Sequence, residues 1–226
     1  EYAEVYSSGG FDVIIGNPPW DRIKPNRENF FSKYDELFRT RNPDEKDEKQ
    51  KELLQDKEIK SKWKERKKEV NILAKYFNQS DDYQLQKPEV GGKTLGTEND
   101  LSALFLERVY HLAKDDAYTS FILPGAIFSG ASGKDLRLEL LEDREAEYLI
   151  GFENHGIFQD IDNRYNFAVL NFKNSGNTEA LKGVFLQENL EILKNPDKNT
   201  LNLDSSLLKS FSPEARIFPN VQNEDD

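Results

Sequence analysis

The feature that most constrains the fold is a short apolar run that stops at two consecutive prolines. Residues 11–16 read FDVIIG, and the four residues that follow are Asn17, Pro18, Pro19 and Trp20. A β-branched, apolar run of this length is typical of a buried strand in a parallel sheet, and prolines cannot donate the hydrogen bonds that would continue it. Because ligands bind at the carboxyl ends of strands in open α/β sheets, we expect segment 17–20 to lie at a binding edge.

The rest of the chain alternates between strand and helix patterns. Apolar runs predict further strands at residues 117–124, 147–152, 165–172 and 181–186. Helical spacing predicts helices at 100–114, with Asp100 as the N-cap, and at about 134–142. This alternation predicts an α/β fold with a partial, doubly wound, Rossmann-like sheet of mainly parallel strands, and the close spacing of the last strands predicts an antiparallel finish.

A charged segment separates the first strand from the rest of this pattern. Residues 30–77 are rich in Lys and Glu, with apolar residues at helical spacing, which predicts a long, largely solvated helical insert. Its basic run at 60–68 (KSKWKERKK) surrounds Trp63. The net charge of −11 argues on its own against a nucleic-acid binder, so this run is either a solvated helix face or a local contact for DNA phosphates.

We divide the chain into four parts on this basis. Residues 1–26 carry the first strand and the proline loop, 27–98 form the charged helical insert, and 99–187 form the rest of the sheet. Glycines and a proline at 84–97 predict a loop at the end of the insert. Residues 188–226 turn polar and contain further prolines, which predicts an exit linker.

Composition excludes several classes of protein. The chain has no cysteine, so disulfides and thiolate chemistry are excluded. Its two histidines, His111 and His155, have no clustered carboxylate partners in the sequence, and we expect no metal site. No apolar run approaches the ~20 residues of a membrane span, and no signal-peptide pattern opens the chain, so we expect a soluble, cytoplasmic protein. A start at Glu1 and the lack of methionine indicate a partial polypeptide.

The groups at 17–20 suit the binding of an exocyclic amine. Two prolines make the loop rigid and leave carbonyls as acceptors. The side-chain carbonyl of Asn17 and the backbone carbonyl of Pro18 would accept both amino hydrogens and leave the nitrogen lone pair free for methylation. Trp20 would stack on a base removed from its duplex. The alternative is an ordinary turn in which Trp20 is a core aromatic.

The same residues carry a family resemblance. Residues 11–20 (FDVIIGNPPW) resemble motif IV of the gamma-type DNA adenine-N6 methyltransferases. Residues 100–114, 117–128 and 152–172 resemble that family's motif V helix, its next strand and its motif VIII, in the same order. The long charged insert resembles the fused type IIG restriction-modification and phage-exclusion enzymes of this family.

The resemblance implies site-specific methylation of adenine N6 in double-stranded DNA, with S-adenosyl-L-methionine (SAM) as cofactor and with base flipping. It implies catalytic roles for Asn17, Pro18, Pro19 and Trp20. It also implies that an aromatic side chain of motif VIII sandwiches the flipped base against Trp20. That aromatic is most simply Phe158, and Phe167 is the alternative.

The departures from the family pattern limit these expectations. The glycine-rich SAM loop and the acidic residue for the cofactor ribose do not occur, so the cofactor-binding residues are unknown. We expect the chain alone to bind SAM weakly and to be inactive, with a target-recognition domain outside it and an unusually apolar sheet edge. Two alternatives stay open: an RNA or protein-glutamine methyltransferase with the same kind of loop, and a catalytically silent module that binds a partner or DNA.

Overall fold

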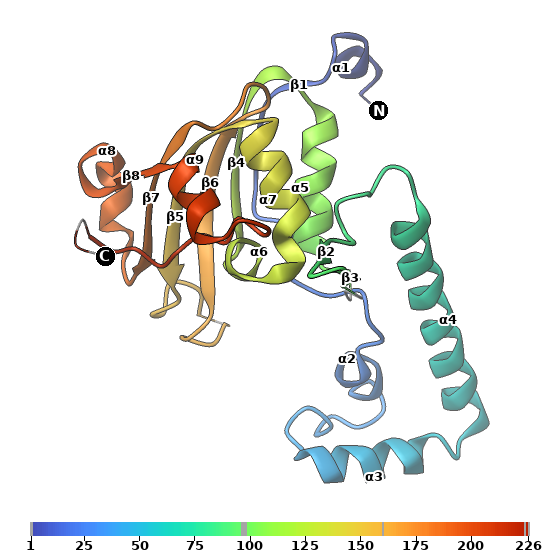
Figure 1. Cartoon of the computed structure of the whole chain (residues 1–226). Helices are drawn as coiled ribbons and strands as arrows, with labels where there is room; N and C mark the ends of the chain where they lie inside the picture. The colour runs from blue at the N-terminus through green and yellow to red at the C-terminus, as the bar shows by residue number, and fades with distance from the viewer. Residues whose placement is uncertain (1, 96–98, 160, 224, 226) are drawn as a thin grey trace.

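The computed structural model describes residues 2–95, 99–159, 161–223 and 225. Its main feature is a six-stranded sheet with the order β1-β4-β6-β5-β7-β8 (Figure 1). In chain order these strands are β1 (Phe11–Gly16), β4 (Ala113–Pro124), β5 (Glu145–Glu153), β6 (Asn166–Lys173), β7 (Ala180–Gln187) and β8 (Leu201–Asp204). A separate two-stranded ribbon consists of β2 (Glu89–Val90) and β3 (Lys93–Thr94).

Four of these six strands run in one direction. β1 is parallel to β4 and β5 is parallel to β7, whereas β6 lies antiparallel between β4 and β5 and β8 is antiparallel to β7. The prediction of a mainly parallel α/β sheet with an antiparallel finish is therefore confirmed. Because β6 runs antiparallel to β4 and β5, the start of β6 lies beside the ends of these two strands. Phe167, near the start of β6, therefore pairs with Pro124 at the end of β4 and with Phe152 near the end of β5. We call this side of the sheet the carboxyl edge.

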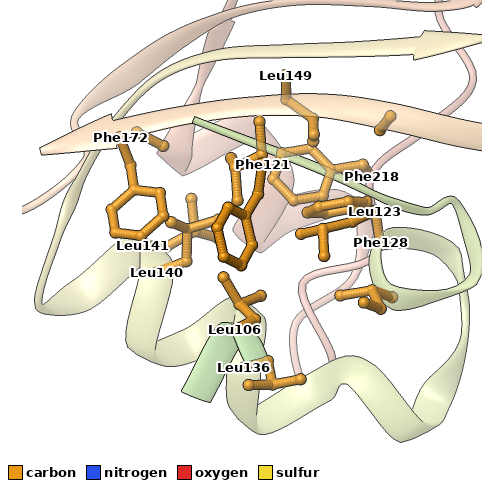
Figure 2. Packing of buried hydrophobic residues seen from close by; sticks show 14 of the residues in the cluster. Leu106, Phe121, Leu123, Phe128, Leu136, Leu140, Leu141, Leu149, Phe172 and Phe218 are labelled. Carbon is orange, nitrogen blue, oxygen red and sulfur yellow. The ribbon is translucent and has the colours of Figure 1, made fainter. Parts of the chain in front are cut away.

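Helices cover one face of the sheet (Figure 1). They are α5 (Leu101–Leu112), α6 (Ala126–Ser129), α7 (Lys134–Glu142) and α9 (Ser205–Phe211). As expected, Asp100 caps α5, because its carboxylate accepts a hydrogen bond from the Ser102 amide at 2.9 Å. Figure 2 shows part of the shared core, which includes Leu106, Leu136, Leu140, Phe121, Leu123, Leu149 and Phe172. Full burial of each such side chain contributes about 1.5–3 kcal/mol.

The remaining short elements lie outside this helical layer or connect its members. They are α1 (Ala3–Ser7), the 3-10 turns η1 (Ala131–Gly133) and η2 (Leu190–Lys194), and α8 (Pro196–Asn199). None of the described helices combines the length and the apolarity that a membrane span requires.

The helical insert projects away from the sheet and has its own core (Figure 1). It contains α2 (Arg27–Phe31), α3 (Pro43–Leu53) and α4 (Lys57–Gln79), which confirms the predicted long charged helical insert. Its buried residues are Phe31, Phe38 and Trp63, with Phe30, Leu53, Leu54 and Ile59 packed against them. All the members of this cluster come from the insert, so the insert holds its shape largely through its own apolar contacts.

The two ends of the insert are joined at the carboxyl edge. The Ile23 amide donates to the carbonyl of Asn99 at 2.8 Å, and the Leu101 amide donates to the carbonyl of Asp21 at 2.9 Å. The insert therefore leaves and rejoins the sheet directly beside segment 17–20. Residues 96–98 lie outside the described residues. The ends of the loop expected at 84–97 and of the insert expected at 27–98 fall on them.

The C-terminal segment differs from the expected exit linker. Residues 201–204 form β8 on the edge of the sheet, and the main core includes Leu203, Leu208 and Phe218. The Phe185 amide also donates to the carbonyl of Val221 at 2.9 Å. A strand of four residues is too short to give a periodic signal in a polar stretch, and for this reason the sequence pattern did not indicate it. Much of the segment after residue 187 is thus part of the sheet domain.

The outer strands of the sheet are β8 on one side and β1 on the other. Among the described residues β1 pairs only with β4. Val13 and Ile15 are 58% and 79% exposed on this strand. Apolar β-branched side chains on an open edge strand are unusual, because such an edge presents both unpaired backbone groups and apolar surface. Segment 11–16 was therefore wrongly predicted to be a buried strand, because it forms an edge strand in which no residue is buried. Its exposed side chains do give the unusually apolar sheet edge that we expected.

Candidate active site

An open pocket of about 580 Å³ lies at the carboxyl end of β1. It is lined by Asn17, Pro18, Pro19, Trp20, Asp21, Phe158, Ile161, Asp162 and Tyr165. The structure thus brings the four residues of the proline loop and Phe158 of the predicted motif VIII together, although they are far apart in the sequence. Phe167 does not line this pocket, because it is 2% exposed in the cluster beneath it.

The proline loop begins where β1 packs tightly on β4. Gly16 pairs with Phe121, and a Cβ at Gly16 would lie 2.8 Å from Cε1 of that ring, so a larger residue would push β1 off its neighbour. After this point Pro18 is buried, whereas Asn17 and Pro19 are exposed. No described residue forms a hydrogen bond with the Asn17 side chain. The Asn17 amide is therefore held at the pocket by a rigid backbone with its polar atoms available.

Trp20 sits between the pocket and the core. Its Nε1 donates to the carbonyl of Ile122 at 3.4 Å, and its ring is half-buried against the cluster that contains Phe167. The Trp20 and Phe158 rings touch edge to face, with centroids 5.3 Å apart and planes at 77°. The pair therefore does not form two parallel walls in this structure, and Trp20 has some of the character of a core aromatic.

Tyr165 is a pocket residue that the sequence interpretation missed. Its ring is nearly parallel to that of Trp20, at 10°, with centroids 5.6 Å apart. The sequence pattern predicts a strand that starts at Tyr165, whereas β6 begins one residue later, at Asn166. Once β6 is known to start at the carboxyl edge, an aromatic residue directly before it can be predicted to line the pocket. Burial raises the pKa of Tyr165 above its usual value, so its phenol is neutral at physiological pH.

Asn154 shapes the loop that carries Phe158. Its side chain is fully buried. Its Nδ2 donates to the carbonyls of Phe158 and Ile161 at 2.9 and 2.8 Å, and its Oδ1 accepts from the Phe158 amide at 2.7 Å. The Asn154 backbone amide donates to the carbonyl of Tyr165 at 3.0 Å. One side chain thus holds Phe158 and Ile161, which line one wall of the pocket.

We expect Asn154→Ala to loosen this loop and leave the sheet intact. The substitution removes the partner of three part-buried backbone groups, and a group left unsatisfied costs up to about 1–3 kcal/mol, the value for full burial. Hydrogen–deuterium exchange should be at least about tenfold faster at the Phe158 amide, since about 1.4 kcal/mol corresponds to a factor of ten, and unchanged in β6. Asn163→Ala, at an exposed asparagine of the same loop, is the control. Equal exchange in the two variants would contradict the role given to Asn154.

The rim of the pocket is acidic. Arg164 forms an ion pair with Asp162 at 2.8 Å and holds the pKa of that carboxyl well below its usual range. Asp21 adds a second carboxyl group, and no lysine or arginine occurs among the described residues that line the pocket. Such a lining accepts hydrogen bonds and does not attract a phosphate. Its chemistry fits an amine on an aromatic ring.

A second polar cluster lies after β5 and corrects one expectation. His155 does have carboxylate neighbours, because its Nε2 lies 3.0 Å from Glu153 Oε2 and 4.0 Å from Glu188 Oε1. These three residues form a group of potential metal ligands. The sequence did not predict this group, because Glu188 follows a different strand from Glu153 and His155. The side chains are exposed or half-exposed, and they lie outside the pocket at segment 17–20.

Comparison with known proteins gives one family and a set of similar folds. The family model described as Eco57I restriction-modification methylase matches residues 36–158, more than half of the chain. A search of curated proteins found no match.

Two solved structures illustrate the similarity of fold. A modification subunit of a putative type I restriction enzyme from Vibrio vulnificus YJ016 has 13% identity and a TM-score of 0.51, over 95% of this chain and 38% of that one. A type I restriction-modification methyltransferase subunit from Streptococcus thermophilus has 12% identity and a TM-score of 0.53, over 97% and 40%. The chain therefore spans about two fifths of the length of these proteins.

Proposed function

Because the chain belongs to the Eco57I restriction-modification methylase family, we propose that it forms the catalytic part of a DNA adenine-N6 methyltransferase. The observation that carries this proposal is the pocket at the carboxyl end of β1. There the exposed amide of Asn17, the rigid Pro18-Pro19 backbone and the ring of Trp20 lie together with Phe158 and Tyr165. Acceptors beside flat aromatic faces suit an amino group on a nucleobase.

The proposed chemistry needs no strong base. The Asn17 side-chain oxygen and the Pro18 carbonyl accept the two hydrogens of the adenine amino group. This draws the nitrogen lone pair out of conjugation with the ring and orients it. SAM, when bound, would supply the methyl group: the new N–C bond would form as the sulfonium C–S bond breaks to leave a thioether, and the nitrogen would then lose one proton to water. No glycine occurs among the described residues that line this pocket, so we assign no cofactor-binding residue to it.

We propose that Trp20 and Phe158 stack on the flipped adenine. Since the two rings contact each other directly in this structure, they separate when the base binds. Tyr165 then forms a third wall next to Trp20. Phe158 is preferred over Phe167 for this role because Phe158 lines the pocket and Phe167 is buried under it.

The wider setting is also a proposal. We propose that the enzyme is of the fused type IIG or phage-exclusion kind, acts in the cytoplasm, and meets double-stranded DNA through a target-recognition domain outside this chain. We propose that the chain divides into the four parts 1–26, 27–98, 99–187 and 188–226, of which the last is folded onto the sheet. We further propose that the chain alone binds SAM weakly and transfers no methyl group.

A substrate comparison tests the proposed class. The full-length protein is incubated with methyl-labelled SAM and with duplex DNA, RNA of the same sequence or a glutamine-containing peptide. We expect label in the DNA only. The same loop chemistry would act on an RNA base or a glutamine amide, so label in the RNA or the peptide, with none in the DNA, would overturn the proposal.

A further inference from the structure

The long helix α4 carries a basic face that the proposed chemistry does not use. The helix has eight Lys and Arg residues against three Glu residues, although the chain as a whole is strongly acidic. Its buried side consists of Trp63 and Val70. Beside this side lies a groove lined by four lysines, two polar residues and one exposed apolar residue: Lys64, Lys67, Lys68, Lys75, Ser61, Asn71 and Ile72. One carboxylate, Glu65, also lines it.

Most of these lysines are not neutralised within the protein. Elsewhere on α4, Lys62 pairs with Glu58 and Arg66 pairs with Glu69. The side chains of Lys64, Lys68 and Lys75 form no hydrogen bond, ion pair or ring contact with any part of the chain that the structure describes. Lys67 is placed over the Trp63 ring at 5.8 Å. The face thus offers unpaired positive charge on a helix that is fixed by its own core.

The spacing of these charges suits a polyanion. Lys64 and Lys68 are about 6 Å apart along the helix axis, and Lys64 and Lys75 about 17 Å, at the usual rise of about 1.5 Å per residue. One strand of duplex DNA carries a negative charge about every 3.4 Å along its axis. The lysine row therefore spans several successive phosphates, while Ser61 and Asn71 add hydrogen-bond donors.

The position of the insert also supports binding of duplex DNA. The insert leaves the sheet beside segment 17–20 and rejoins it there, so α4 and the loop that carries Phe158 project from the same edge of the sheet (Figure 1). The pocket itself has an acidic rim and no lining lysine or arginine among the described residues. The one arginine at this rim, Arg164, already pairs with Asp162, so the lysines of α4 add positive charge that the described pocket lining does not supply.

We infer that the lysine face of α4, formed by Lys64, Lys68 and Lys75, binds the phosphate backbone of duplex DNA without regard to sequence. The inference rests on the proposed function for the choice of DNA as the polyanion. Phosphate contacts position a protein on DNA and carry no sequence information, so this face holds the duplex while the pocket acts on one base.

The test compares two triple variants of the full-length protein. One replaces the face with Lys64→Gln, Lys68→Gln and Lys75→Gln. The matched control, Lys49→Gln, Lys62→Gln and Lys194→Gln, removes the same charge from lysines that already pair with Glu52, Glu58 and Glu191. Fluorescence anisotropy measures binding to a labelled 30-bp duplex of arbitrary sequence from about 50 to 200 mM salt, a range over which phosphate contacts lose much of their strength.

The face variant should lose most of its backbone contacts. Each phosphate contact contributes about 0.9 to the slope of log affinity against log salt, so we expect the slope to fall by about two to three and the affinity at 50 mM salt to fall at least tenfold, on any sequence. The control should keep the wild-type slope. Equal slopes in the two variants would overturn the inference.

Methyl transfer is measured separately, so that the two proposals fail in different ways. At saturating DNA the face variant should methylate at the wild-type rate, because none of its substitutions touches the pocket. Normal methylation with equal slopes overturns the inference alone. A lowered slope in a protein that methylates no DNA supports the inference and removes the proposed function.

Discussion

Asn17→Ala is expected to slow methyl transfer about 10²–10³-fold while the dissociation constant for DNA changes little. The size follows from losing one hydrogen bond that is aimed at the reacting group in the transition state. Asn17 lines the pocket, is exposed, and forms no side-chain hydrogen bond with any described residue, so its removal should not disturb the fold. Single-turnover methylation at saturating DNA measures the chemical step directly.

Two further variants make the Asn17 experiment specific. Asn17→Asp keeps acceptor oxygens at the same position and should retain much more activity than Asn17→Ala. Asn163→Ala removes an exposed asparagine from the neighbouring loop and should methylate at the wild-type rate. A near wild-type rate for Asn17→Ala would show that the amide does not activate the nitrogen, whatever the substrate.

Trp20→Ala is expected to weaken capture of the flipped base by roughly 5–150-fold, which corresponds to the ~1–3 kcal/mol of one stacking face. The loss should appear as a raised KM and as a missing fluorescence increase from 2-aminopurine at the target position. Trp20 also packs against Phe158, Tyr165 and Phe167, so the variant should unfold at a lower temperature as well.

Trp20→Phe and Trp20→Leu separate stacking from packing. Phenylalanine keeps a flat ring, whereas leucine keeps apolar volume without one. If Trp20 stacks on the base, phenylalanine restores the fluorescence increase and leucine does not. If leucine restores it equally, Trp20 is only a core residue that supports the pocket, and the stacking role is excluded.

The parts of the fold that the sequence predicted are those with strong local signals. The run at 11–16 is β-branched and ends at two prolines, so both the strand and its end followed from backbone chemistry. The helical insert followed in the same way from its charge and spacing. The pocket was predicted in part, because Asn17 and Trp20 directly follow that strand.

The residues that were missed depend on how distant strands pair. Tyr165 reaches the pocket because β6 runs antiparallel and starts at the carboxyl edge, and local spacing does not reveal direction. Asn154 matters because its side chain bonds to the backbone of its own folded loop. Glu188 meets His155 only because β5 and β7 are neighbours.

The central claim is that the pocket methylates the exocyclic amine of adenine. The most direct test digests DNA treated with the full-length protein and SAM to nucleosides and identifies the methylated product by mass spectrometry. The proposed function predicts N6-methyladenine. Methylation of the cytosine amino group would keep the amine chemistry of Asn17 and Pro18 but contradict the choice of base, and a methyl group on cytosine carbon 5 would contradict the mechanism itself.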